Sequence, residues 1–192
     1  MKKNVIRIVV AIVLISVIVG GYYAFTISKK ASSEESLELT EVQKVITKNL
    51  EENYPATPRE VVKYYNRIIS CFYNETYTED ELYALGDQAR LLFDEELLAN
   101  NPREQYFSAL EADIENYRAK SKTIMNTNVC DSNDVKFQTI DGDECAYVTA
   151  SYFVEEGKTY NRTYQMYVLR KDKEDNWKIL VFYQIEGDSV NE

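Results

Sequence analysis

The sequence predicts an α+β protein in which N-terminal helices pack on a four-stranded antiparallel sheet, preceded by a single transmembrane helix. Three observations predict this class. An apolar run occupies residues 5–25. Capped segments with apolar residues at helical spacing then follow to about residue 121. From about residue 125 the chain changes to short runs rich in Val, Tyr, Phe, Thr and Ile, separated by turn residues.

The apolar run at residues 5–25 has the length of a membrane span. It contains one charged residue, Arg7, and a helix of this length covers about 31 Å, the thickness of a hydrocarbon core. Lys2 and Lys3 precede it, which places the N-terminus in the cytoplasm. The run is longer than the apolar stretch of a cleaved signal peptide, and no A-x-A site follows it. We therefore expect an uncleaved signal-anchor in the cell membrane, with the rest of the chain extracytoplasmic.

The remaining chain is expected to form one domain on a stalk. The predicted order is a cytoplasmic tail at 1–4, the signal-anchor at 5–25, a Ser-rich polar stalk at 26–39, an extracytoplasmic α+β domain at 40–188 and a tail at 189–192.

Four helices are expected in the first half of the domain, within residues 39–55, 56–74, 78–101 and 101–121. Thr40, Thr57 and Thr78 each precede a Glu or Gln three residues later, which is the pattern of a capping box. The fourth segment opens with Asn101 and Pro102, which favour a helix start. Apolar residues at helical spacing give each segment one face to bury.

Four strands are expected in the second half, within residues 134–141, 143–156, 158–172 and 176–188. The connections between them are short, so consecutive strands should be antiparallel neighbours in a meander. In the last strand, strict alternation places one set of apolar residues on one face: Trp177, Ile179, Val181, Tyr183 and Ile185. Leu180 and Phe182 then lie on the other face, so this strand is apolar on both sides.

The composition excludes several kinds of function. The chain carries a net charge of −10 although residues 1–30 carry only basic charges, so the body is acidic and unsuited to nucleic acid. Histidine is absent from the sequence, which removes the commonest general base and the commonest metal ligand. The three cysteines, Cys71, Cys130 and Cys145, have no metal-site spacing. We expect free thiols, with a Cys130–Cys145 disulfide as the alternative.

Two acidic stretches, residues 131–134 and 141–144, could be taken for calcium loops. Neither has oxygen ligands at the spacing that an EF-hand requires, and Asp, Asn and Gly form turns without a metal. The sequence therefore predicts no catalytic, cofactor-binding or metal-binding residue and no cofactor.

The order of the elements is similar to that of a known superfamily. The stretch DKEDNWKILVFYQIEG, residues 172–187, resembles the last strand of NTF2-like (cystatin-like, cone-shaped) proteins, in which a charged turn leads into W-[KR]-I. The resemblance covers about residues 55–188, and is strongest to membrane-anchored extracytoplasmic members of Gram-positive bacteria. It implies a curved sheet around a long helix with a cavity between them. The sequence has no motif that assigns the superfamily's catalytic roles to particular residues of this chain.

Two functions of different class are expected. The first is a membrane-anchored binding or adaptor domain for an unidentified protein or small ligand, which predicts a cavity or apolar patch. The second is an enzyme of the ketosteroid-isomerase-like type, which predicts a buried Asp or Glu beside a Tyr in a pocket. We favour the binding domain. The resemblance also implies a homodimer through the open sheet face, which size-exclusion with light scattering on residues 31–192 can test.

Overall fold

The computed structural model describes residues 39–187. The helices are α2 (Glu41–Ile46), α3 (Pro58–Asn74), α4 (Glu79–Arg90), α5 (Glu95–Asn100) and α6 (Arg103–Ala119), with a short 3-10 turn at Ser132–Asp134. The strands are β1 (Lys122–Val129), β2 (Lys136–Ile140), β3 (Asp143–Glu156), β4 (Thr159–Lys171) and β5 (Trp177–Ile185). The α+β class is confirmed.

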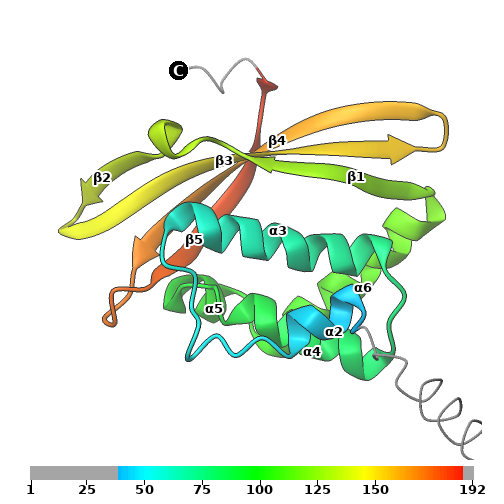
Figure 1. Cartoon of the computed structure of the whole chain (residues 1–192), viewed down its shortest axis with the longest axis horizontal. Coiled ribbons are helices and arrows are strands. Elements are labelled where there is room, and N and C mark those ends of the chain that lie inside the picture. Colours follow the sequence, from blue (N-terminus) through cyan, green and yellow to red (C-terminus); the bar gives the residue numbers. More distant parts are fainter. Residues whose placement is uncertain (1–38, 188–192) are drawn as a thin grey trace, which may run out of the picture. The chain divides into compact units, whose positions relative to one another are not determined.

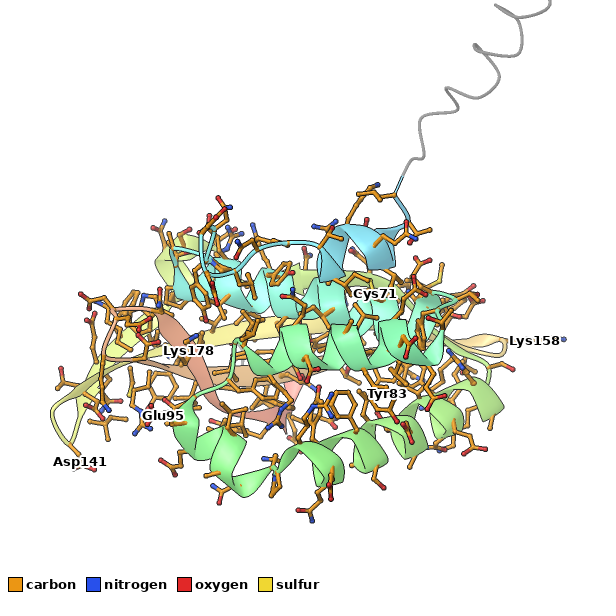
Figure 2. All side chains as sticks on the ribbon, turned by 90° about the horizontal axis from the view of Figure 1, so that it is seen from below. Cys71, Tyr83, Glu95, Asp141, Lys158 and Lys178 are labelled. Atoms are coloured by element: carbon orange, nitrogen blue, oxygen red, sulfur yellow. The ribbon has the colours of Figure 1, made fainter. Side chains whose placement is uncertain are left out.

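The sheet has five antiparallel strands, so the prediction of four was one strand short. Its order is β1-β3-β4-β5, and β2 also pairs with β3. β1 lies against residues 150–156 of β3 and β2 against residues 143–147, so the two strands share one edge. The predicted meander of β2, β3, β4 and β5 is confirmed. The hairpin turns at Asp141 and Lys158 lie at opposite ends of the sheet (Figure 2).

The helices α2 to α6 lie on one side of the sheet, and α3 runs directly beneath it (Figure 1). The predicted caps are confirmed at Thr40, Thr57 and Thr78, whose side chains accept hydrogen bonds from the third following backbone N–H. The sequence predicts that Asn101 caps α6, and this prediction is wrong. Asn101 ends α5 instead, where its Nδ2 donates to Leu97 O over 3.0 Å, and Pro102 precedes α6 without a side-chain cap.

The expected helix at 78–101 is broken into α4 and α5 by contact with the sheet. Ile179 N donates to Leu92 O over 2.8 Å, and Asp94 N donates to Ile179 O over 2.9 Å. Residues 92–94 thus extend the edge at β5, and this long-range pairing replaces the helical hydrogen bonds that local propensity favours. The first expected helix is also shorter than its segment, since α2 ends at Ile46.

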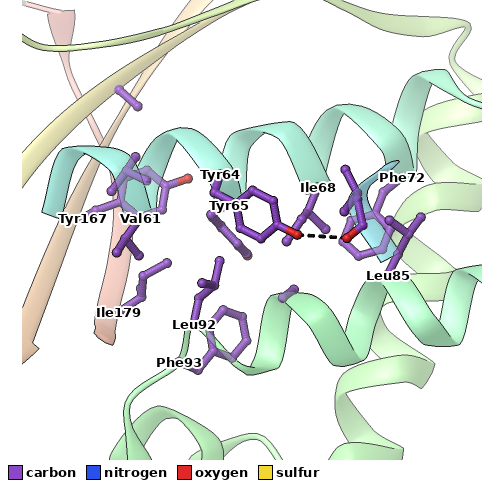
Figure 3. Close-up of a cluster of buried hydrophobic side chains, with 14 of the residues drawn as sticks. Val61, Tyr64, Tyr65, Ile68, Phe72, Leu85, Leu92, Phe93, Tyr167 and Ile179 are labelled. Atoms are coloured by element: carbon purple, nitrogen blue, oxygen red, sulfur yellow. Dashed lines mark hydrogen bonds between the residues drawn. The ribbon is translucent and has the colours of Figure 1, made fainter. Parts of the chain in front are cut away.

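The core lies between α3, α4 and the sheet (Figure 3). α3 contributes Val61, Ile68 and Phe72, which are almost fully buried, and Leu85 of α4 packs on the same side. Tyr64 shows how a buried phenol is satisfied here, because its hydroxyl donates to Val45 O over 2.9 Å. Apolar burial on this scale supplies most of the free energy that favours folding.

β5 changes faces at a bulge, so the predicted alternation along this strand is wrong beyond its first three residues. Leu169 pairs with Ile179, but Val168 pairs with Val181, which leaves Leu180 unpaired at the register shift. Trp177 and Ile179 are buried in the core, and Phe182 then points to the same side, against Tyr65. Beyond the bulge, the opposite face receives Val181 and Tyr183, which are 41% and 48% exposed.

The sheet face opposite the helices is uncovered within residues 39–187 (Figure 1). It carries Tyr164, Met166, Val181 and Tyr183 from β4 and β5. The homodimer expected through this face stays a prediction. Within the same residues, every helix is too short or too polar to span a bilayer, and the predicted signal-anchor at 5–25 and stalk at 26–39 lie outside them, apart from Leu39.

A buried ion pair joins the α4–α5 connection to the sheet. The Asp94 side chain is 6% exposed and accepts from Arg170 Nη2 over 2.6 Å and from Arg170 Nε over 3.1 Å. The same carboxylate caps α5 by accepting from Glu96 N over 2.9 Å. Removing the guanidinium would therefore leave a buried charge without its partner.

We predict that Arg170→Met lowers the free energy of unfolding by about 3 kcal/mol. Arg103→Met is the matched control, because Arg103 also binds an aspartate, Asp87, through two nitrogens, but both side chains are about half exposed. It should cost less than about 1 kcal/mol. Urea unfolding of the two variants measures the difference, and equal losses would contradict the role given to the Asp94 pair.

Candidate functional site

A cavity of about 600 Å³ lies on the helical side of the sheet, between α3, α6 and four of the strands. α3 contributes Tyr65, Ile69, Phe72 and Tyr73; α6 contributes Tyr106, Ala109, Leu110, Asp113, Asn116 and Tyr117; the sheet contributes Lys122, Ile124, Tyr152, Val154, Thr163, Gln165, Phe182 and Gln184. We call it the tyrosine cavity. Its volume lies in the range of pockets that hold small molecules.

The cavity exists because α6 covers the core only in part. Of its 17 residues only Phe107 and Ile114 are buried. Phe107 fixes the helix against α4, where a Cβ on Gly86 would meet the Phe107 ring at 2.2 Å, so the close approach requires glycine. Beyond that contact, Ile114 is the only other buried residue of α6, and Asp113 beside it lines the cavity.

Five tyrosines supply most of the aromatic wall: Tyr65, Tyr73, Tyr106, Tyr117 and Tyr152. The rings of Tyr73 and Tyr117 lie with centroids 4.2 Å apart and planes tilted by 35°. Tyr65 also packs edge-on against Tyr167 behind the wall, at 5.9 Å. A wall of this kind offers flat apolar contact together with polar edges.

Burial raises the pKa values of all five phenols, so they remain protonated well above neutral pH. It raises the pKa of Tyr65 and of Tyr152 well above the ordinary value near 10. Burial also raises the pKa of Tyr117 to about 12. For Tyr73, burial raises the pKa first and the hydrogen bond to Asp113 adds to the shift. The phenols are therefore neutral groups that can donate or accept hydrogen bonds.

A chain of hydrogen bonds behind the wall links Asn66 and two buried tyrosines to Gln165, which lines the cavity. Tyr152 Oη lies 2.5 Å from Asn66 Oδ1 and 2.5 Å from Tyr167 Oη, and Tyr167 donates to Gln165 Oε1 over 2.8 Å. Three contacts need three hydrogens, but two phenols have only two. Asn66 is 1% exposed, and its Nδ2 has no partner within residues 39–187.

Turning the Asn66 amide end for end balances the hydrogen count, because its Nδ2 would then donate to Tyr152. Tyr152 then donates to Tyr167, and Tyr167 donates to Gln165. Gln165 Oε1 thus already accepts a hydrogen bond from Tyr167. Its Nε2 remains able to donate a hydrogen bond to a ligand in the cavity.

The cavity contains two charged residues, and their surroundings differ. Asp113 Oδ2 accepts the hydrogen bond of Tyr73, and Asp113 has no basic residue within ion-pair distance in the described part of the chain. Lys122, in contrast, is paired with Glu156 at 3.2 Å. The carboxylate of Asp113 is therefore the unbalanced charge on the wall.

The features noted in the sequence lie elsewhere. The three cysteines are free thiols, Cys71 and Cys145 buried and Cys130 half-buried. The acidic stretches at 131–134 and 141–144 form ion pairs, Asp131 with Arg59 at 3.7 Å and Asp143 with Arg170 at 3.5 Å. Between residues 39 and 187, no three acidic or thiol side chains gather as a metal site would require.

Sequence reasoning missed the residues that give the cavity its chemistry. Asp113 lies in the predicted fourth helix next to the apolar residue Ile114, and Gln165 lies in a strand that was expected only as part of the sheet. The signal that could have found Asp113 is its place on the same helical face as Tyr106, Leu110 and Tyr117, at spacings of three, four and seven residues.

The comparison with known families gives one match. The model of a family described as a domain of unknown function (DUF6715) matches residues 1–182, nearly the whole chain. No curated protein matches the sequence.

We predict that Tyr152→Phe and Tyr167→Phe each lower the free energy of unfolding by about 1–3 kcal/mol, because each leaves buried polar groups without partners. Since the two phenols belong to one chain of hydrogen bonds, the loss of unfolding free energy in the double variant should differ by about 1 kcal/mol from the sum of the two single losses. Urea unfolding followed by the fluorescence of Trp177 measures this. Tyr83→Phe, which removes an exposed bond to Glu111, is the control and should change little. If the losses from Tyr152→Phe and Tyr167→Phe are additive, the two phenols do not belong to one chain of hydrogen bonds.

Proposed function

We propose that this chain, which belongs to the DUF6715 family, is a binding domain that holds a small, largely apolar ligand in the tyrosine cavity. The observation that supports the proposal is the cavity itself: about 600 Å³, walled by five tyrosines, with a lining that is more apolar than polar. Close packing normally fills the space between a helix and a sheet, because packed side chains gain dispersion energy. A cavity of this size on the core side of a sheet is the usual form of a ligand pocket.

We also propose that the domain is NTF2-like and attached to the outer surface of the cell membrane. A long helix lying beneath an antiparallel sheet, with a cavity on that side, agrees with the expected cone. The hydropathy of residues 5–25 supports the anchor, and Lys2 and Lys3 support an extracytoplasmic domain. The domain would then meet its ligand outside the cytoplasm.

A second candidate function is proton transfer by a carboxylate–tyrosine pair, and one observation favours it: Tyr73 and Asp113 are hydrogen-bonded and both line the cavity. Two features favour binding instead. Asp113 is exposed, whereas the enzyme hypothesis requires a buried acid. The Tyr73 hydroxyl already donates its hydrogen bond to Asp113, so it cannot donate one to an oxyanion. Exchange of the α-hydrogens of cyclohexanone in D₂O, faster with the wild type than with Asp113→Asn, would instead support the enzyme.

The cavity proposal predicts that Ala109→Trp weakens binding of N-phenyl-1-naphthylamine, a neutral fluorescent apolar probe, by about tenfold or more, because the indole fills the space. Ala112→Trp is the matched control: it lies three residues away on the same helix, is exposed and does not line the cavity. Fluorescence titration of both full-length variants measures the difference. Absence of saturable binding to the wild type, or equal binding by both variants, would contradict the proposal.

The membrane proposal predicts that the full-length chain stays in the membrane fraction after alkaline carbonate extraction, whereas a chain lacking residues 1–25 does not. It also predicts that protease added to intact protoplasts degrades the domain. A domain that survives until the protoplasts are lysed would contradict the extracytoplasmic location.

A further inference from the structure

We propose that the ligand of the tyrosine cavity carries a cationic amine, so that the cavity selects an apolar molecule with one ammonium group that binds Asp113. This inference rests on the proposed function, since it names the chemical class of the ligand that the cavity takes. It follows from the charge balance of the wall, the arrangement of the rings near the carboxylate and the charge of the whole chain.

The charge balance of the wall favours a cation. The cavity is lined by one acid, Asp113, and one base, Lys122. Glu156 already neutralises Lys122 at 3.2 Å, whereas Asp113 is paired with a neutral phenol. Of the two carboxylate oxygens, Oδ2 accepts from Tyr73, and no donor within residues 39–187 bonds to Oδ1. An ammonium N–H would give Oδ1 a charge-assisted hydrogen bond.

The rings near Asp113 suit the same ligand. Tyr73 bonds directly to the carboxylate, and its ring lies 4.2 Å from that of Tyr117. Ring faces carry negative potential and attract cations, organic ammonium groups in particular. Lys122 is one cation already near these rings, since its Nζ lies 5.7 Å from the centroid of Tyr117.

The remaining polar groups do not select the charge of a ligand. Phenols, Gln165 and Gln184 can each donate or accept, so they tolerate an acid, an alcohol or an amine. The field of the protein does discriminate, because the chain has 32 acidic and 22 basic residues and thus attracts cations and repels anions. A carboxylate ligand would be repelled by this negative field and by Asp113, and within residues 39–187 the wall has no unpaired cation to bind it.

The test compares three probes that share one apolar body: 4-phenylbutylamine, 4-phenylbutanol and 4-phenylbutyrate. Isothermal titration into the full-length chain in zwitterionic nanodiscs, with empty nanodiscs as the blank, gives each affinity. We expect the amine to bind about fivefold more tightly than the alcohol, and the carboxylate to bind most weakly. Asp113→Asn should lower the affinity for the amine by about fivefold and leave that for the alcohol within about twofold.

Glu111→Gln is the matched control, since Glu111 is an exposed acid on the same helix that also accepts a tyrosine hydroxyl, that of Tyr83, but lies outside the cavity wall. It should change none of the affinities. If the alcohol binds as tightly as the amine, or Asp113→Asn leaves the preference unchanged, the amine inference is overturned while cavity binding stands. If none of the three probes binds the wild type, the proposed function itself fails.

Discussion

The domain depends on the way α3 lies across the helical face of the sheet. Val61 and Ile68 of this helix are fully buried and build the core with the sheet and α4. Asn66, on the same helix, makes the buried polar contact to Tyr152 of β3. Tyr65 and Tyr73 complete one wall of the cavity. A single helix therefore sets the core, its buried polar contact and the cavity, and any change in its position would alter all three.

The buried polar groups make that position specific. An apolar interface tolerates small shifts, because hydrophobic contacts have no direction. The contacts of Asn66, Tyr152, Tyr167 and Gln165 have direction, and a misplaced α3 would leave several buried groups without partners. The same constraint explains how a cavity can persist beside a packed core: the walls are held by hydrogen bonds as well as by packing.

Sequence reasoning succeeded where the signal is local. The caps at Thr40, Thr57 and Thr78 use residues three positions apart, and the meander follows from short turns. It failed where distant residues decide. The end of α4 depends on the contact of residues 92–94 with Ile179, and no Gly or Pro marks that break. The bulge at Leu180 is hidden because apolar residues occupy both faces of β5.

β1 was missed for a related reason. Its sequence, KTIMNTNV, alternates weakly, with a register shift after Ile124 and with Asn126 and Asn128 on the side away from the helices. Its pairing with the distal half of β3 compensates for this weak local preference. The candidate site was beyond sequence reasoning because it needs α3, α6 and the sheet together: Asp113 and Gln165 are separated by 52 positions and meet only at the cavity wall.

NMR on full-length protein with ¹³C-labelled tyrosine rings, titrated with 4-phenylbutylamine, tests whether the tyrosine cavity is a ligand site. We expect saturable shifts for the five tyrosines of the wall and unchanged signals for Tyr147 and Tyr183, which lie on the opposite face of the sheet. Cavity tyrosines that do not respond, or shifts spread equally over all tyrosines, would rule out a ligand site in the cavity.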